Sequence, residues 1–279
     1  MPISMPVSTS FIQKFHHHFA GNHDSTKKLV FLHGLMGQGA NWRSIARSFE
    51  KDFHILYYDQ RGHGQSMFPV EGYAPEDCVG DLKTILDELG WESVYLVGHS
   101  MGGRVAALFT YLYPTRVTRL VIEDIGPDAN PLAIQRIEYL MEGIPAPFAD
   151  SVRAKAYFSG EFLTQFSQYA NPKALGLFLL SNFMNTAKGE FDWRFDKQLM
   201  LRFIRQSRSK DRYDEFKGIL VPTLLIRGQD SQELTAEVYA RVLRENSRIN
   251  GLEIAGAGHW VHYDRFREFT IAVQNFFTL

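Results

Sequence analysis

The chain has 279 residues, enough for one large domain or for a core that carries a smaller insertion. Its 30 Lys and Arg residues nearly balance its 31 Asp and Glu residues, giving a formal net charge of -1. Nothing in this balance points to nucleic acid or to an anionic membrane surface. The composition therefore favours a small molecule as the partner.

The sequence also suggests a compartment. No segment has the length and apolarity of a membrane span, and Met1–Gln13 lacks a basic region followed by a continuous apolar stretch. The one cysteine, Cys78, has no partner for an internal disulfide, and its helical surroundings favour a small apolar side chain. We expect a cytoplasmic protein, and the oligomeric state stays open.

The N-terminal part of the chain begins with Phe11–Phe19, which we expect to be a first strand. Its three consecutive histidines, His16 to His18, could suggest metal binding, but alternate side chains of a strand point to opposite faces. From residue 28 onward, short apolar runs alternate with amphipathic helical stretches. This alternation predicts an α/β fold, in which helices cover both faces of a mostly parallel sheet. The predicted strands are residues 28–32, 53–58, 94–97, 118–123, 222–227 and 251–255.

The alternation stops between residues 127 and 218, where no clear sheet strand can be predicted. We expect a core of residues 1–126 and 219–279 and a helical cap insertion of residues 127–218, with some of its many aromatic side chains lining an apolar pocket. A basic run near the end of this segment is expected to be a solvated helix and linker, and the alternative is contact with an anionic substrate tail such as that of coenzyme A. The run consists of Arg202, Arg205, Arg208, Lys210 and Arg212.

Ser100 is the candidate nucleophile. It is the centre of a G-x-S-x-G sequence, Gly98-His99-Ser100-Met101-Gly102, between a predicted strand and a predicted helix. The flanking glycines suit a sharp turn at which a side chain would collide with neighbouring backbone. The backbone N–H groups of Met101 and of Leu35, in the glycine-containing loop after residues 29–32, are the expected oxyanion hole.

A serine hydroxyl needs a general base, and that base needs a third group to orient it. His259 is the preferred base because it ends a flexible loop, residues 255–259, directly after the last predicted strand. His262 is the alternative base. His33 and His99 are expected to have structural roles, with His99 pointing away from the nucleophile.

Two aspartates compete to orient the base. Asp124 ends the strand at residues 118–123, and Asp230 follows the strand at residues 222–227. Both satisfy the chain order serine, acid, histidine, and spacing alone does not separate them. A separate charged cluster consists of Asp59, Arg61 and His63. We expect it to have a structural role and to hold its loop against the core.

These motifs resemble the α/β-hydrolase superfamily, and they are similar to its small cap-bearing carboxylesterase and thioesterase branch. The matching pieces are His33-Gly34, residues 59–66, Gly98 to Gly103, Asp124-Ile125-Gly126-Pro127, Trp193-Arg194-Phe195 and Gly258-His259-Trp260. The resemblance favours Asp124 as the acid, because residues 124–127 are similar to the acid-bearing loop of that branch. In many other members the acid occupies the place of Ser231, and Asp230 lies one residue before it.

The expected function is a serine hydrolase that cleaves small to medium acyl esters or thioesters through an acyl-enzyme on Ser100. It needs no cofactor, and no cysteine cluster or H-E-x-x-H helix predicts a metal site. A lactonase, a carbon–carbon hydrolase or a perhydrolase could use the same residues. A ligand receptor or scaffold that retains the fold is the alternative from another class.

Overall fold

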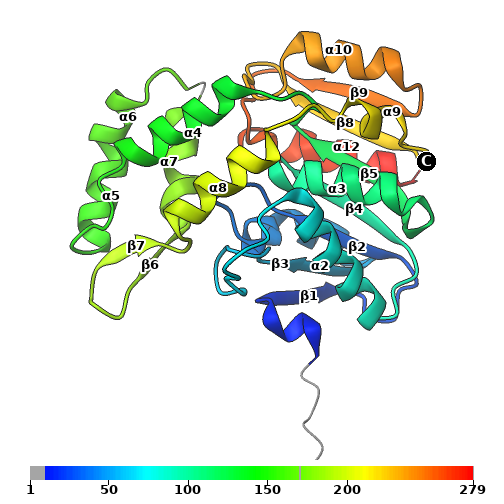
Figure 1. Cartoon of the computed structure of the whole chain (residues 1–279), viewed down its shortest axis with the longest axis horizontal. Coiled ribbons are helices and arrows are strands. Elements are labelled where there is room, and N and C mark those ends of the chain that lie inside the picture. Colours follow the sequence, from blue (N-terminus) through cyan, green and yellow to red (C-terminus); the bar gives the residue numbers. More distant parts are fainter. Residues whose placement is uncertain (1–9, 170, 279) are drawn as a thin grey trace, which may run out of the picture.

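The computed structural model describes residues 10–169 and 171–278. The expectation about a targeting segment therefore falls largely on residues 1–9, outside the described part. Seven strands form one sheet in the order β1-β3-β2-β4-β5-β8-β9, as Figure 1 shows. β1 is antiparallel to β3, and the other neighbouring pairs are parallel, which confirms the predicted class. The strands are β1 (His17–Gly21), β2 (Lys28–Leu32), β3 (His54–Tyr58), β4 (Val94–His99), β5 (Val117–Glu123), β8 (Thr223–Gly228) and β9 (Ile249–Ile254).

Side chains on alternate positions of the strands enter two different apolar clusters. Val30 and Leu32 of β2 belong to the cluster that contains α2 and α3, whereas Leu29 and Phe31 belong to the cluster that contains α1 and α12. Helices therefore cover both faces of the sheet, as predicted. The helices outside the β5–β8 connection are α1 (Arg43–Ala46), α2 (Pro75–Glu88), α3 (Met101–Leu112), α10 (Ala236–Glu245), α11 (Val261–Asp264) and α12 (Phe266–Thr278), with short 3-10 turns at Phe11–Lys14, Gly39–Trp42, Arg47–Phe49 and Pro114–Arg116.

The connection between β5 and β8 extends away from the sheet (Figure 1). It contains α4 (Pro131–Gly143), α5 (Ser151–Ser159), α6 (Glu161–Gln165), α7 (Pro172–Ser181), β6 (Phe183–Asn185), β7 (Phe191–Trp193), α8 (Lys197–Ser207) and α9 (Tyr213–Lys217). A backbone hydrogen bond from Arg212 N–H to the Pro127 carbonyl, 2.7 Å long, joins the two ends of this connection. The connection leaves the sheet at the carboxyl end of β5 and, after α9, enters the parallel strand β8 at its amino end.

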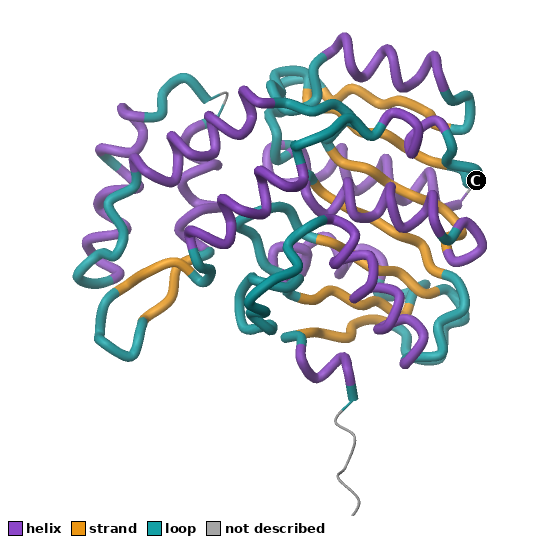
Figure 2. The backbone as a smooth tube through the Cα atoms, viewed as in Figure 1, coloured by secondary structure: helices purple, strands orange, loops and turns teal. Residues whose placement is uncertain are grey.

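Two local expectations from the sequence were wrong. The connection is not purely helical, because β6 and β7 form an antiparallel hairpin, visible in Figure 2, whose turn contains Gly189 at φ 83°. The first strand is also shorter than Phe11–Phe19. Residues Phe11–Lys14 form a 3-10 turn, because the Glu88 carboxylate accepts hydrogen bonds of 2.8 Å from the N–H groups of Phe11 and Ile12.

The charged loop after β3 ties neighbouring loops together, as expected. Asp59 accepts hydrogen bonds from the N–H groups of Gly39 and Gln65, at 2.7 and 3.0 Å. Arg61 makes a two-point contact with the Asp81 carboxylate, at 2.5 and 2.6 Å. These contacts hold the loop against α2 and against the turn that follows β2.

His33 and His63 are buried beside this loop as neutral rings. His33 Nδ1 donates to the Gly34 carbonyl, and its Nε2 accepts from the Gln60 N–H, each over 2.8 Å. Burial lowers the pKa of His33 from 6.5 to about 4. Burial, with His33 as a close neighbour, lowers the pKa of His63 to about 3.

Among the described residues, none of the helices combines the length and the apolarity that crossing a bilayer requires.

Replacing Phe269 by alanine should destabilise the fold. This α12 side chain is fully buried between the sheet and Trp42, so its loss leaves a cavity that costs about 3–5 kcal/mol in the free energy of unfolding. Urea unfolding measures the change. The matched control is Ile271→Ala on the same helix, where the side chain is 54% exposed and a change within about 1 kcal/mol is expected. Equal losses in both variants would contradict this docking of α12.

The free energy of unfolding should fall as the pH drops below 6.5. The unfolded chain then takes up a proton on His63 that the folded chain refuses until the pH approaches 3. Each such histidine removes up to about 1.4 kcal/mol of stability per pH unit within that window. In His63→Asn, the dependence of the unfolding free energy on pH should be weaker by the uptake of about one proton. An unchanged slope in His63→Asn would be inconsistent with a neutral buried ring.

Candidate active site

Ser100 lies on a sharp bend between β4 and α3. Its backbone has φ 52° and ψ -117°, a conformation that non-glycine residues rarely adopt. A Cβ atom on Gly98 would lie 2.3 Å from the Gly102 carbonyl oxygen, and one on Gly102 would lie 2.4 Å from the Leu32 carbonyl oxygen. The two glycines therefore allow β4, β2 and α3 to approach through their backbones, as the motif predicts.

A continuous chain of hydrogen bonds connects Ser100 to His259 and Asp124. The Ser100 hydroxyl lies 2.9 Å from His259 Nε2, and His259 Nδ1 lies 2.8 Å from Asp124 Oδ2. Because a carboxylate can only accept, Nδ1 carries the proton and Nε2 is free to accept one from the serine. The three residues come from the ends of β4, β5 and β9, which all lie at the carboxyl edge of the sheet.

The Asp124 carboxylate accepts from two further donors. Oδ1 receives a 2.9 Å hydrogen bond from Gly228 N–H, and Oδ2 also receives one from the Ser231 hydroxyl. Burial raises the pKa of Asp124, and the donors from His259, Ser231 and Gly228 oppose that rise by stabilising the charged form. Asp230, the other candidate acid, makes no side-chain hydrogen bond to His259 in the described part of the chain.

Ser231 was noted in the sequence only as the place where many relatives carry the acid. The structure gives it a different contact, as a hydroxyl donor to Asp124. Asp124 itself has φ 49°, which turns its side chain from the end of β5 toward β8. The loop after β8 thus contributes a donor rather than an acid to this site.

Leu35 and Met101 lie beside Ser100. Both line an enclosed cavity that also includes Ser100 and His259. Met101 is the first residue of α3, so its N–H has no acceptor within the helix. Met36, the residue after Leu35, has φ 62°, and a hydrogen bond from Gly37 N–H to the Gly34 carbonyl closes this turn. The two expected oxyanion residues are therefore brought to the same cavity.

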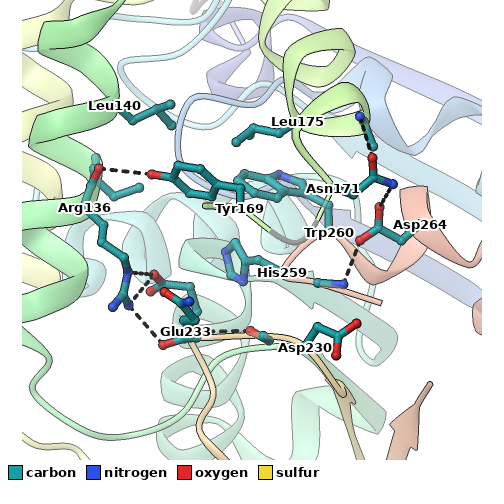
Figure 3. Close-up of a pocket in the computed structure, with 15 residues that line it drawn as sticks. Arg136, Leu140, Tyr169, Asn171, Leu175, Asp230, Glu233, His259, Trp260 and Asp264 are labelled. Carbon is teal, nitrogen blue, oxygen red and sulfur yellow. Dashed lines mark hydrogen bonds and ion pairs between the residues drawn. The ribbon is translucent and has the colours of Figure 1, made fainter. Parts of the chain in front are cut away.

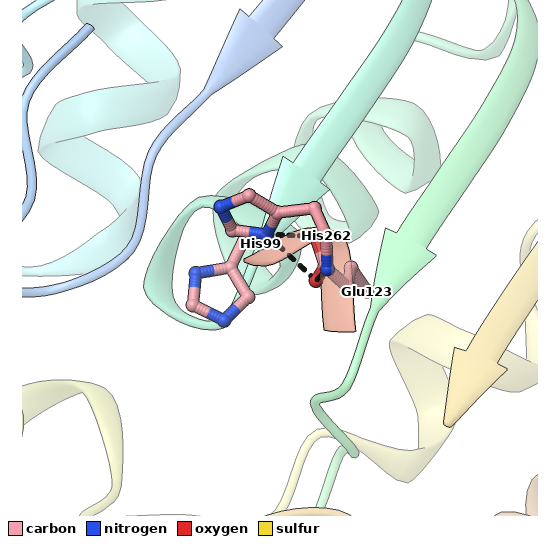
Figure 4. Close-up of side chains that lie close together, drawn as sticks. All are labelled: His99, Glu123 and His262. Atoms are coloured by element: carbon pink, nitrogen blue, oxygen red, sulfur yellow. Dashed lines mark hydrogen bonds and ion pairs between the residues drawn. The ribbon is translucent and has the colours of Figure 1, made fainter. Parts of the chain in front are cut away.

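His99, Glu123 and His262 form a buried cluster beneath the site, shown in Figure 4. Their potential metal-ligating atoms lie within 4.8 Å of one another, but protein contacts already use several of them. Glu123 accepts from His262 Nδ1 at 2.8 and 2.9 Å and from His262 N–H at 2.9 Å. His99 Nε2 lies 3.0 Å from the His259 carbonyl. The alternative base His262 is thus paired with Glu123, and this cluster supports the backbone around His259.

A larger pocket also borders His259 (Figure 3). The β5–β8 connection contributes apolar and aromatic side chains, including Leu140, Tyr169 and Leu175, and the loop after β9 contributes Trp260. Glu233 lies at its edge and pairs with Arg136 Nη2 at 2.7 Å. Glu233 and His259 also line the enclosed cavity around Ser100, so the two spaces share a boundary. Sequence reasoning did not identify Glu233, because a single acidic residue in a loop carries no distinguishing pattern.

The basic run divides into exposed and buried members. Arg202, Arg205 and Lys210 are exposed, as expected for a solvated helix and linker. Arg208 and Arg212 are buried, which corrects that expectation for these two positions. Arg208 Nη2 donates to Glu233 at 2.9 Å, and Arg212 contacts Glu215 and Glu76 at 2.9 and 2.8 Å. Carboxylates supplied by distant parts of the chain make this burial possible.

The chain is similar in sequence to known lipases and esterases. The chain is 30% identical over 264 residues to the sn-1-specific diacylglycerol lipase of Danio rerio, covering 92% of this chain and 80% of that protein. It is 28% identical over 254 residues to the esterase YbfF of Escherichia coli, covering 88% and 91% of the two chains.

A solved structure, the crystal structure of E-2-(acetamidomethylene)succinate hydrolase, superposes with a TM-score of 0.84 at 22% identity and covers 95% of each chain. That likeness supports the fold. The family description of the alpha/beta hydrolase fold matches residues 27–266. With this match across most of its length, the chain belongs to the α/β-hydrolase family.

Proposed function

We propose that the protein is a serine hydrolase that cleaves small to medium acyl esters or thioesters through an acyl-enzyme on Ser100. The observation that carries this proposal is the hydrogen-bonded chain from Ser100 Oγ through His259 to Asp124. Relatives named as an esterase and a lipase support a carboxylic ester hydrolase.

In the first step, Ser100 Oγ attacks the carbonyl carbon of the substrate while His259 Nε2 takes the hydroxyl proton. Asp124 keeps the imidazole oriented and stabilises its protonated form. The N–H groups of Leu35 and Met101 donate to the carbonyl oxygen as negative charge develops on it. When the tetrahedral intermediate collapses, the bond to the alcohol or thiol breaks, and the leaving group receives the proton from His259.

The second step releases the acyl group. Water attacks the acyl carbon of the ester on Ser100, and His259 takes a proton from that water. The bond to Ser100 Oγ then breaks, and the proton returns from His259 to the serine. The products are a carboxylic acid and the free enzyme, so the cycle needs no redox partner.

The cap in this proposal is residues 127–218. Support comes from the outer pocket, where Leu140, Tyr169 and Leu175 of this segment face His259 and Trp260 of the core (Figure 3). Each methylene that such a pocket buries contributes about 0.8 kcal/mol until the space is full. We also propose the cytoplasm as the compartment, because the one cysteine of the chain, Cys78, is a buried thiol.

Replacing Ser100 by alanine should abolish turnover of a p-nitrophenyl acyl ester and labelling by a fluorophosphonate probe. Loss of the nucleophile lowers kcat by about a millionfold, because no other group supplies the attacking oxygen. The thermal melting temperature should stay close to that of the wild type, since the hydroxyl contributes mainly chemistry. Undiminished steady turnover by a pure Ser100→Ala sample would falsify the nucleophile assignment. Wild-type protein that reacts only once and then stays modified would indicate a receptor instead of an enzyme.

Asp124→Asn should damage catalysis far more than Asp230→Asn. Asp124 accepts from three donors, and an amide would present an N–H to one of them. Replacing a triad aspartate in this way lowers kcat by about 10⁴. Asp230→Asn should lower kcat by about tenfold or less, because a neighbouring carboxylate changes only the electric field at the site. The comparison uses kcat, with folding checked by thermal melting. A crippled Asp230→Asn beside a near-normal Asp124→Asn would reverse the assignment of the acid.

A further inference from the structure

Arg208 places an incompletely paired guanidinium group beside the nucleophile. It follows α8, its side chain is only 3% exposed, and it lines the enclosed cavity that also contains Ser100 and His259. Its Nη2 donates to Glu233 at 2.9 Å. Its Nη1 is buried and has no hydrogen-bond partner within the described residues, and Asp128 Oδ1 is 4.0 Å away.

The lining of this cavity has more guanidinium groups than carboxylates. Arg104 of α3 also lines it, and its guanidinium donates to the backbone carbonyls of Ser207 and Asp128. The Glu233 carboxylate is shared between Arg208 and Arg136. Two guanidinium groups, those of Arg104 and Arg208, therefore line the cavity together with one carboxylate, that of Glu233.

Outside this lining, Asp128 lies 4.0 Å from Arg208, and Glu215, which also acts on Arg104, pairs with Arg212 at 2.9 Å. The Asp124 carboxylate lies across His259 and already accepts from three donors. Burial, together with the positive charge of Arg208, lowers the pKa of Arg104 well below its ordinary value. A buried guanidinium N–H group without an acceptor is costly, so this arrangement suits an anion that enters with the substrate.

We propose that Arg208 binds a carboxylate group of the substrate, a few bonds from the carbonyl that Ser100 attacks. Guanidinium groups bind carboxylates through short, charge-assisted hydrogen bonds, and Arg208 keeps Nη1 available for one. Because Arg208 and Ser100 line the same small cavity, the carboxylate belongs close to the scissile bond. The preferred substrates are thus anionic esters or thioesters. This inference rests on the proposed function and specifies its substrate class.

The test compares esters that differ only in a carboxylate that replaces a terminal methyl group. For the acyl side, the pair is mono-p-nitrophenyl glutarate and p-nitrophenyl valerate. For the alcohol side, the pair is γ-acetoxybutyrate and butyl acetate. In the wild type, kcat/KM for the anionic member of one pair should exceed that of the neutral member by about tenfold or more, the usual value of a hydrogen bond to a charged group.

Arg208→Gln should bring that ratio close to one, whereas kcat/KM for the neutral ester should change much less. A general loss of structure would lower both members of a pair together, so the ratio separates recognition from folding. Arg205→Gln is the matched control, because Arg205 is on the adjacent turn of α8, is 59% exposed and pairs with Glu138. It should keep the wild-type ratio. Where Arg208→Gln does not fold, inhibition of the wild type by glutarate and by valerate replaces it, and glutarate should inhibit at least about tenfold more strongly.

If the anionic ester is preferred in the acyl-side pair, the carboxylate belongs to the acyl group of the substrate. If it is preferred in the alcohol-side pair, the carboxylate belongs to the alcohol. Turnover of neutral esters with no anionic preference in either pair would overturn the carboxylate site and leave the serine-hydrolase function intact. A preference that survives in folded Arg208→Gln, or equal inhibition by glutarate and valerate, would overturn it as well. Folded wild-type protein that turns over none of the four esters would count against both proposals.

Discussion

The site depends on a backbone contact that only glycine permits. Gly98 and Gly102 bring β4, β2 and α3 so close that an added Cβ would lie within 2.4 Å of a carbonyl oxygen at either position. This contact forces the bend that gives Ser100 its positive φ. The rest of β4 is a buried strand, and the bend places the serine hydroxyl outside the sheet, within reach of His259. One strand further along, β5 supports the same arrangement, because the Glu123 carbonyl accepts from Ser100 N–H at 3.0 Å and its carboxylate holds His262.

Charged side chains join the loop after β8 to the β5–β8 connection at the edge of the site. Glu233, from the loop after β8, pairs with Arg136 of α4 and with Arg208 after α8. These ion pairs lie where the outer pocket meets the cavity around Ser100. A buried pair contributes little net stability after desolvation, but losing one partner leaves a costly unpaired charge. Arg136, Arg208 and Glu233 therefore both hold the β5–β8 connection in place and determine the charge at the edge of the site.

The sequence predicted the features that depend on local pattern. The strands within the sheet match the predicted apolar runs to within one or two residues at most ends, because a buried parallel strand needs a short apolar run. The Gly98–Gly102 motif predicted the bend at Ser100, since the bend depends only on neighbouring residues.

Contacts between residues that are far apart in the sequence could not be predicted from local pattern. Phe11–Lys14 forms a 3-10 turn because it is hydrogen-bonded to Glu88, which is 76 residues from Ile12 in the sequence. Arg208 and Arg212 are buried because they pair with acids that are far away in the sequence. Spacing could not separate Asp124 from Asp230, because the orientation of Asp124 depends on donors from the neighbouring β8 loop.

The central claim is that Ser100 carries the acyl group between the two halves of the reaction. The most direct measurement is rapid acid quenching of the wild-type protein during turnover of a p-nitrophenyl acyl ester, followed by mass spectrometry of its peptides. The account predicts an adduct with the mass of the acyl group on the peptide that contains Ser100, formed within the first turnover and lost when substrate is exhausted. Steady turnover with no acylated peptide, or with the acyl group on a different residue, would contradict it.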